Sequence, residues 1–411
     1  MTTDSAPQII EGHASVAYSD LRGDCLGLRA LVPRGSEAFL TTSSATVVTA
    51  ALLALDGHAA AVHLLPHAIQ QPSGKFQSVE INAPGGAVAR MSLSEPRITG
   101  PEETGWVVYT SGTTGAPKPV HHSLQSLTRT VRSTGVSDLV WGLLYDPLRM
   151  AGLQVLLQCL NSSSSLVVPS LELPVADKVR FMVREGVSAL SATPTLWRLI
   201  SQVPDTSDWN LRQVTLGGEI ADQRILDVLA ARFPQSRVSH IFASTETGAA
   251  FSVTDGLAGF PIDYLSEPPR GIQLLVKDDR LWVRNTQSSE ADSFGYVDTG
   301  DVVEIVGRRV YFKGRASGVV NIGGTNIWPE EVETLIRTHP DVSDAVVYAV
   351  PNPLVGNLLI ATVVPKVPEH AESLKKNLRH WIRERAAGTM VPAKVAVVTS
   401  LVSSETGKAM R

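Results

Sequence analysis

Residues 106–118 read WVVYTSGTTGAPK, a short apolar run followed by hydroxyl side chains and glycines, with a lysine at the end. Glycine lets backbone N–H groups approach a ligand closely, the hydroxyls add donors, and lysine supplies a point charge. This arrangement after a buried strand predicts a polyphosphate-binding loop, and the alternative is a flexible surface loop. The GxxxxGK[ST] loop is excluded, because Pro117 and Pro119 keep the chain extended around Lys118.

Short β-rich runs alternate with helical runs around this loop. We expect strands at 39–42, 61–65, 106–109 and 166–168, and helices at 45–55 and 177–185. Such alternation predicts α/β layers with mostly parallel strands. The pattern then changes, and residues 273–276 and 280–284 are typical of a hairpin.

The last 95 or so residues have the length and pattern of a small α/β domain. We expect strands at 342–350, 360–364 and 394–398, with a helix at 372–385. The predicted organisation is a large N-terminal α/β domain of several subdomains over residues 1–315 and a small C-terminal α/β domain over residues 316–411.

Composition places the chain among ordinary globular proteins. It has 411 residues, 43% hydrophobic and 18% charged, with a formal net charge of -4 and no long basic run, so nucleic-acid binding is not expected. Cys25 and Cys159 share no metal-type spacing, which favours a reduced, cytoplasmic protein. No signal peptide is predicted. The apolar run 45–55 is too short for a bilayer, so no membrane association is expected.

The string YTSGTTGAPK, Tyr109 to Lys118, resembles the signature loop of the acyl-adenylate-forming superfamily. That superfamily includes acyl-CoA ligases, luciferase-like enzymes and the adenylation domains of peptide synthetases. Pro119 departs from the family, which usually has glycine there. The resemblance implies that the loop wraps the β- and γ-phosphates of ATP, through Thr110, Ser111, Gly112, Thr113, Thr114, Gly115 and Lys118.

Two further sequence motifs follow the loop in the order in which the family has them. VTLGGE, 214–219, implies that Gly217, Gly218 and Glu219 lie against the adenine, although an ordinary strand-to-helix turn has the same form. IFASTETG, 241–248, is similar to a Tyr-Gly-x-Thr-Glu motif in which Phe242 replaces tyrosine. The resemblance implies that Thr245 contacts the α-phosphate, that Glu246 holds Mg²⁺, and that the nucleotide also contacts Phe242, Ala243 and Ser244. The alternative to a metal-binding role for Glu246 is that its carboxylate stabilises a helix N-terminus through the helix dipole.

The remaining motifs lie around the domain boundary and at the end of the chain. VDTGD, 297–301, implies that Asp301 binds the ribose hydroxyls, and GRASG, 314–318, that Arg315 reaches ribose or phosphate. Ser317 stands at the family's hinge position, usually Asp or Lys. Gly323 and Gly324 are expected to line a pantetheine tunnel. Lys408, in the terminal GKAMR, is expected to bridge the acid and the α-phosphate.

The resemblance implies that a carboxylic acid is activated to acyl-AMP and then joined to coenzyme A, with ATP and Mg²⁺ as further cofactors. Two alternatives stay open: transfer to a carrier-protein thiol or an amine in trans, and a partly inactive, non-adenylating relative. The chain is nearest in length to o-succinylbenzoate–CoA ligases, which residues 150–156, MAGLQVL, also resemble. A homodimer would be common in the family.

The identity of the acid is the least determined feature. Arg149 lies where relatives place a gate to the acyl pocket, and we hypothesise that it pairs with a second anionic group of the acid. A structural ion pair is the alternative. His122 lies near the site by resemblance, although a lone histidine is more often structural. By position near the motifs, the acid-binding residues are expected to be His122, Trp141, Arg149, Leu153, Leu216 and Ala249.

Overall fold

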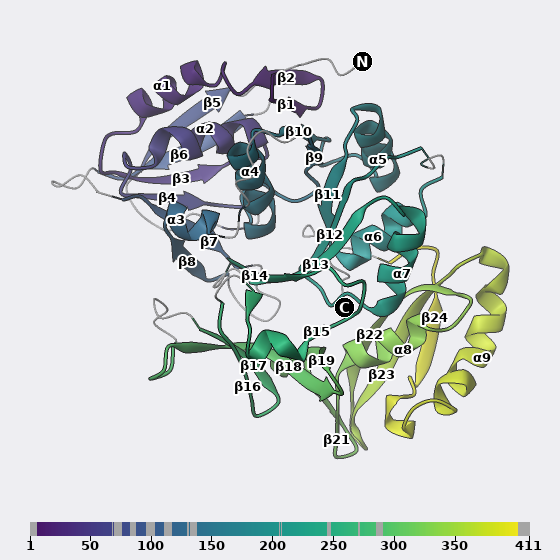
Figure 1. The fold of residues 1–411 in the computed structure, drawn as a ribbon. Coiled ribbons are helices and arrows are strands. Elements are labelled where there is room, and N and C mark those ends of the chain that lie inside the picture. Colours follow the sequence, from purple (N-terminus) through teal and green to yellow (C-terminus); the bar gives the residue numbers. More distant parts are fainter. Residues whose placement is uncertain are drawn as a thin grey trace.

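The structure is a computed structural model, and Figure 1 shows its ribbon. It describes residues 6–401 apart from 68, 70–75, 83–87, 96–102, 111–116, 130, 132–137, 205, 207, 245–247, 270–271 and 285–290. Within these ranges, no helix is both long and apolar enough to cross a bilayer.

An eight-stranded sheet forms the centre of the large N-terminal part. Its inner strands are parallel, whereas the strand at each edge is antiparallel to its neighbour. The prediction of parallel α/β layers is confirmed for this sheet. In spatial order its strands are β14 (Gly248–Val253), β13 (Arg237–Ser244), β12 (Gln213–Gly217), β11 (Ala189–Ala192), β9 (Val140–Gly142), β10 (Ser165–Val168), β1 (Gln8–Glu11) and β2 (Ala14–Ala17).

A six-stranded mixed sheet contains the strand that leads into the predicted phosphate loop. Only the three central strands β3, β4 and β7 run parallel, and the hairpin β5–β6 was not predicted from the sequence. In spatial order the strands are β5 (Gln77–Asn82), β6 (Val88–Leu93), β3 (Glu37–Thr41), β4 (Ala61–Leu64), β7 (Gly105–Tyr109) and β8 (Pro119–His122).

A five-stranded antiparallel sheet forms a third lobe, drawn in green in Figure 1. The predicted hairpin is present as β16 and β17. The change of pattern predicted for this part of the chain is confirmed, because short connections between consecutive strands allow only antiparallel pairing. Its strands in spatial order are β15 (Phe260–Pro261), β19 (Arg309–Arg315), β18 (Tyr296–Val306), β17 (Arg280–Arg284) and β16 (Leu274–Lys277).

Helices cover both faces of the central sheet. One hydrophobic core joins α1, α2 and α4 to strands of the six-stranded and eight-stranded sheets, so these helices pack between the two sheets. A second core packs α5, α6 and α7 on the eight-stranded sheet. The helices of the large part are α1 (Arg22–Leu31), α2 (Ala45–Leu55), α3 (Leu124–Thr128), α4 (Met150–Ser162), α5 (Val175–Arg184), α6 (Pro194–Ser201) and α7 (Gln223–Arg232).

Helix α2 confirms the predicted buried helix and shows how its polar end is satisfied. Every residue except Leu53 is buried, as expected for a helix that is apolar on all sides. The Glu11 carboxylate accepts hydrogen bonds from the Ala45 backbone N–H at 2.9 Å and from the Ser44 hydroxyl at 2.8 Å. An anion at this position satisfies free N–H groups and complements the helix dipole.

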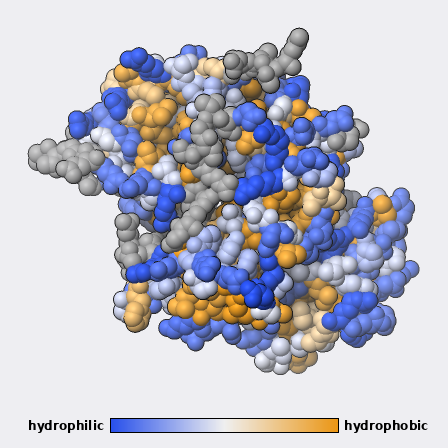
Figure 2. All heavy atoms as spheres, in the orientation of Figure 1, coloured by the Kyte–Doolittle hydropathy of each residue, from blue (hydrophilic) through white to orange (hydrophobic). Residues whose placement is uncertain are grey.

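The small C-terminal part has its own core and follows the predicted β-β-α-β order. Its three-stranded sheet contains β22 (Val342–Asn352), β23 (Gly356–Pro365) and β24 (Lys394–Val397), next to a two-stranded hairpin of β20 (Val320–Ile322) and β21 (Thr325–Ile327). Its helices are α8 (Pro329–Arg337) and α9 (Ala371–Arg383). The outward face of α9 is hydrophilic in Figure 2, as its alternation of charged and apolar residues predicts.

Candidate functional site

Two of the predicted nucleotide-binding segments leave the same edge of the central sheet. β12 and β13 are adjacent and parallel, with Gly217 opposite Ile241 in the register. The turn after Gly217 and the segment Phe242–Ser244 are therefore side by side at the carboxyl ends of the strands. In open α/β sheets, this edge is where ligands bind.

The turn after β12 anchors the helix that packs beside it. Gly218 has a φ of +81°, a conformation that favours glycine. The Glu219 carboxylate accepts a hydrogen bond of 2.9 Å from the Thr195 N–H in the first turn of α6. Tyr145 is buried beside Ser191 and Glu219, and burial raises the pKa of its hydroxyl. Glu219 thus has a structural partner, and its predicted contact with adenine stays a prediction.

Phe242 belongs to an aromatic stack between the central sheet and the green lobe. Its ring centroid lies 5.4 Å from that of Phe251 and 5.3 Å from that of Phe312, with interplanar angles of 20° and 9°. Phe312 is on β19, in a different sheet. Packing therefore accounts for an aromatic ring at this position, while the loss of the tyrosine hydroxyl has no structural explanation.

Asp301 and Arg315, predicted separately from two motifs, are in direct contact. The Arg315 Nη1 donates to the Thr299 carbonyl at 2.8 Å and to Asp301 Oδ1 at 3.0 Å. Between them Gly300 has a φ of +75°, and a Cβ there would lie 3.5 Å from the guanidinium. Burial raises the pKa of the Asp301 carboxyl, and Arg315 opposes that rise. The arginine therefore holds a half-buried carboxylate in position.

The base of the predicted phosphate loop is closed by two reciprocal hydrogen bonds. The Thr110 N–H donates to the Lys118 carbonyl, and the Lys118 N–H donates to Thr110 Oγ1, both at 3.0 Å. Pro119 begins β8, opposite Tyr109 on β7. The Tyr109 hydroxyl lies 3.0 Å from His63 Nδ1, which ties the strand before the loop to the neighbouring strand β4. The two ends of the loop are thus held together.

The predicted acid-binding residues are distributed over several parts of the fold. Leu153 and Leu216 have no exposed surface and belong to different hydrophobic cores. Trp141 is half-buried on β9. His122 Nδ1 lies 3.3 Å from the Ser126 hydroxyl, beside the capping box that begins α3. His122 therefore has a structural partner in Ser126, and the role of this set in acid binding stays a prediction.

Arg149 precedes the first residue of α4 and has a carboxylate neighbour. Its Nε lies 3.8 Å from Asp146 Oδ2, and both side chains are largely buried, at 14% and 19% exposure. Gly152 allows the chain to approach itself closely at this turn, because a Cβ there would lie 2.2 Å from the Asp146 carbonyl oxygen. The alternative of a structural ion pair is therefore present, and pairing with an anionic group of the substrate stays a prediction.

Several predicted residues lie outside the described ranges. They are Ser111, Gly112, Thr113, Thr114, Gly115, Thr245, Glu246 and Lys408, together with the side chains of Ser244 and Ala249. Among the described side chains, no group of three or more His, Cys, Asp and Glu is arranged to hold a metal ion. The magnesium ligand predicted from the sequence, Glu246, is not among them.

Gly323 and Gly324 form the turn between β20 and β21. Their φ values are +56° and +87°, and a Cβ on either would meet no atom within 4 Å. The Gly323 N–H donates to the Val355 carbonyl at 3.0 Å, a contact within the small part of the chain. In this arrangement the glycine turn therefore faces open space.

Sequence reasoning missed a buried cluster of charged side chains between the large and small parts. We call Arg198, Asp222, Glu333, Arg337 and Asp344 the docking cluster. One local signal was available, since Asp222 stands just before an amphipathic run and caps α7 through the Ile225 N–H at 3.0 Å. Its arginine partners are distant in sequence, so no local pattern could reveal them.

Solved structures share this fold across the whole chain. ATP-bound MatB from Rhodopseudomonas palustris is 19% identical with a TM-score of 0.74, covering 100% of this chain and 95% of its own. The o-succinylbenzoate CoA synthetase MenE from Bacillus subtilis, in complex with the acyl-adenylate intermediate OSB-AMP, is 17% identical with a TM-score of 0.65, again covering 100% and 95%. The predicted two-part α/β fold is confirmed.

Sequence relatives agree with this likeness. The fatty acid–[acyl-carrier-protein] ligase MmaC of Mycobacterium marinum is 25% identical over 74% of this chain and 66% of its own length. The 2-succinylbenzoate–CoA ligase of Bacillus subtilis is 26% identical over 75% and 68%. The alignments thus span about two thirds of these relatives. The AMP-binding enzyme model matches residues 31–283, and the AMP-binding enzyme C-terminal domain model matches residues 331–408. The resemblance read from the motifs is confirmed: the chain belongs to the AMP-binding, acyl-adenylate-forming enzyme family.

Proposed function

We propose that this protein uses ATP to convert a small carboxylic acid to an acyl-adenylate and then joins the acyl group to coenzyme A. The observation that supports this most directly is the shared edge of β12 and β13, from which both the Gly217–Glu219 turn and the Phe242–Ser244 segment emerge. Two further features support it: Asp301 is held by Arg315, and the phosphate loop is closed at its base by Thr110 and Lys118.

In the first step, a carboxylate oxygen of the acid attacks the α-phosphorus of ATP, and the bond to pyrophosphate breaks. Mg²⁺ enters with the nucleotide as part of the substrate, and Glu246 is the proposed ligand. Positioning and charge neutralisation supply most of the rate in such reactions. Asp301 would accept hydrogen bonds from the ribose hydroxyls, and Lys408 would offset the charge that grows at phosphorus.

In the second step, the thiol sulfur of coenzyme A attacks the acyl carbonyl. AMP leaves with the electron pair of the broken C–O bond, and the thiol proton is released. For this step we propose that residues 316–411 move as a domain relative to residues 1–315 and bring Gly323 and Gly324 to the site. A side chain at either position would narrow the path of the pantetheine arm. A cytoplasmic location, where ATP and coenzyme A are available, is part of the same proposal.

A carrier-protein thiol is the second candidate acceptor. Two mycobacterial relatives, MmaC and FadD10, bear the name of fatty acid–[acyl-carrier-protein] ligases. The chemistry of the first step is the same for either acceptor, so only the second step distinguishes them.

The first experiment is acid-dependent exchange of labelled pyrophosphate into ATP, with aromatic, dicarboxylic, fatty and terpenoid acids. Exchange with one class identifies the acid, and coenzyme A or a phosphopantetheinyl carrier protein is then added to identify the acceptor. If no acid supports exchange while a synthetic acyl-adenylate still reacts with coenzyme A, the proposal fails at the first step.

A matched pair of variants ties the exchange to the site. Asp301→Asn removes the charge of a carboxylate that is 15% exposed and bound by Arg315. Asp263→Asn removes the charge of a carboxylate that is 60% exposed and bound by Arg308 in the same lobe. We expect a higher KM for ATP in the Asp301 variant alone. Equal changes in both variants would contradict the assigned ribose contact.

A further inference from the structure

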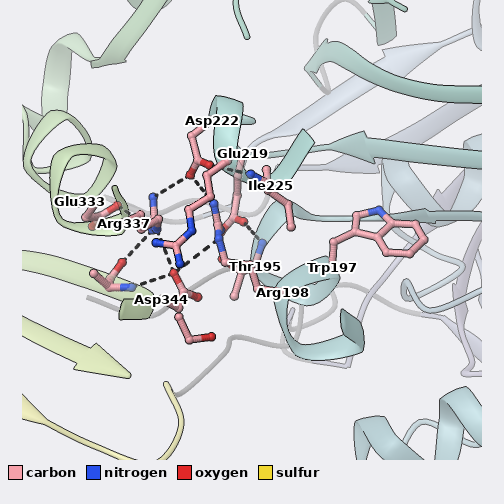
Figure 3. A network of polar contacts seen from close by, with 12 residues as sticks. Thr195, Trp197, Arg198, Glu219, Asp222, Ile225, Glu333, Arg337 and Asp344 are labelled. Carbon is pink, nitrogen blue, oxygen red and sulfur yellow. Dashed lines mark hydrogen bonds and ion pairs between the residues drawn. The ribbon is translucent and has the colours of Figure 1, made fainter. Parts of the chain in front are cut away.

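The docking cluster is a buried contact of two arginines and three carboxylates between the large and small domains. Arg198 on α6 and Asp222 before α7 belong to the large domain, and Glu333, Arg337 and Asp344 belong to the small one. Their side chains are only 5–9% exposed. Figure 3 shows the five residues pointing toward one another from the two sides.

Each domain neutralises most of its own charge within the cluster. In the large domain, Arg198 Nη2 donates to Asp222 Oδ2. In the small domain, Arg337 Nε donates to Asp344 Oδ1 at 2.9 Å, and its Nη2 lies 3.4 Å from Glu333 Oε2. These contacts do not cross the interface, so they can persist when the domains separate.

Within the docking cluster, the ion pairs that cross the interface are the longer ones. Arg198 Nε lies 3.7 Å from Asp344 Oδ1, and Arg337 Nη1 lies 3.5 Å from Asp222 Oδ2. Removing one partner of a buried ion pair is strongly destabilising, because it leaves a charge uncompensated. Separation of the domains avoids that penalty here, since every arginine keeps a carboxylate of its own domain. Water also becomes available to the separated groups.

Two hydrogen bonds lie at the edge of the cluster, and farther along the interface Lys313 of the large domain pairs with Glu331 of the small one at 2.9 Å. Gln202 Nε2 donates to the Ser343 hydroxyl at 2.7 Å, and Arg224 Nη1 donates to the His339 carbonyl at 3.1 Å. Both are in positions that water can reach, and their net contribution is modest for that reason. The contacts around the docking cluster are therefore polar, unlike the apolar cores inside each domain.

The cluster is also connected to the proposed nucleotide site. Glu219 caps α6, which contains Arg198, and Asp222 caps α7 three residues later. The same short segment thus follows the proposed adenine turn and contacts the small domain. In this docked arrangement, a Cβ on Gly323 or Gly324 would meet none of the described atoms within 4 Å, so neither position packs on the described part of the large domain.

We propose that the docking cluster positions the small domain for adenylate formation and releases it, without leaving an unpaired charge, for the thioester step. Arg198, Asp222, Arg337 and Asp344 are then positioning residues, which act through the orientation of the domain that contains Lys408. This inference rests on the proposed function for its catalytic consequence, but the docking itself can be measured without catalysis.

The test variant is Asp344→Asn. An amide oxygen can still accept from the Ala345 N–H, as the carboxylate does at 2.8 Å, and Arg337 keeps Glu333 as a partner. The attraction to Arg198 across the interface is lost. The matched control is Glu384→Gln, which removes a carboxylate from the exposed surface of the same domain, where it pairs with Arg385.

Docking is measured by energy transfer between dyes on the two domains, with Glu172→Cys and Lys376→Cys as exposed attachment sites in a Cys25→Ser background. We expect the docked-to-undocked ratio to fall about fivefold in Asp344→Asn, the size of effect typical of one lost ion pair. The control should match the unmodified protein. Equal ratios in the two variants would overturn the proposal.

The catalytic readout separates positioning from simple destabilisation. Asp344→Asn should lower acid-dependent pyrophosphate exchange several-fold, while transfer from a supplied acyl-adenylate to coenzyme A is unchanged or faster. A parallel fall in both half-reactions would mean that the cluster is only structural. If no acid supports exchange in the unmodified protein, the proposed function fails, and the dye measurement still decides whether the cluster docks the domains.

A reversible crosslink provides the complementary test. Gln202→Cys and Ser343→Cys, in the Cys25→Ser background, are joined by a short reducible bis-maleimide. The locked protein should keep most of its pyrophosphate exchange activity, while its rate of thioester formation should fall more than tenfold. Reductant, which cleaves the crosslink, should restore that rate. Full thioester formation in the locked protein would contradict the proposal, because the domain would then have no need to leave the docked position.

Discussion

Replacing Gly314 by alanine should disfavour the docked orientation of the small domain. A Cβ at this position would lie 2.8 Å from Trp328 Cδ1 and 2.8 Å from Glu330 Oε2, both beyond the predicted hinge. Overpacking of this kind costs about 1–3 kcal/mol. At tenfold per 1.4 kcal/mol, the docked-to-undocked ratio should fall about 5- to 140-fold.

Gly307→Ala is the control for backbone strain. Gly307 also has a positive φ, +59°, but a Cβ there would meet no atom within 4 Å. Both substitutions strain the backbone and should lower the Tm, whereas only Gly314→Ala adds a clash that depends on docking. Pyrophosphate exchange should therefore fall at least fivefold further in Gly314→Ala than in Gly307→Ala. Exchange rates within twofold of each other would refute the reasoning.

Three other predictions concern the site. Burial raises the pKa of the Asp301 carboxyl, so this carboxylate loses its charge at a higher pH than an ordinary aspartate. The KM for ATP, measured by steady-state kinetics, should therefore rise as the pH falls through that pKa. In Asp301→Asn the KM for ATP should be higher by about 10- to 100-fold and should not change over this pH range. Phe242→Leu removes the stacks with Phe251 and Phe312 and should lower the free energy of unfolding by about 1–3 kcal/mol. Urea denaturation measures this change, and an unchanged denaturation midpoint would contradict the prediction. Arg149→Ala should raise the KM for acids with a second anionic group more than for monocarboxylic acids, and an equal KM ratio would leave Arg149 with a structural role, which includes its ion pair with Asp146.

Asp222 makes the docking interface sensitive to acid. Burial raises the pKa of its carboxyl, but Arg198, Arg337 and the Ile225 N–H outweigh that effect and hold the pKa below its ordinary value. A lowered pKa means that the carboxylate stabilises the fold at neutral pH, and that this stability is lost as the pH falls through the lowered value. Cross-domain attraction is lost over the same range, because a protonated Asp222 no longer attracts Arg337.

The strand before the predicted phosphate loop was predictable because its signal is local. A strand that ends in hydroxyls, glycines and a lysine is a property of consecutive residues, and the structure has that strand as β7 with the loop closed by Thr110 and Lys118. Helix α2 has the predicted bounds for the same reason, since a uniformly apolar run of this length has one favourable environment. The order of motifs also identified the family before any fold was known.

Other features could not be predicted, because they depend on residues that are distant in the sequence. Phe242 has an aromatic ring at its position in the motif, and only the fold shows that this ring packs against Phe251 and Phe312. Arg149 was proposed as a substrate contact, and only the loop around Asp146 provides its structural partner. The strand order of the antiparallel lobe also depends on distant residues, since it is decided by how the connections between the strands fold back.

By itself, the sequence determined the family, the positions of its motifs, the buried helix α2 and the presence of a small C-terminal α/β unit. Tertiary structure alone decided which charges meet: Arg198 with Asp222 inside one domain, Arg337 with Asp344 inside the other, and weaker pairs between them. The physical reason is the distance along the chain over which each kind of interaction acts. Turn chemistry and hydrophobic periodicity act over a few residues, whereas the energy of a buried charge depends on every group the folded chain brings within a few ångströms.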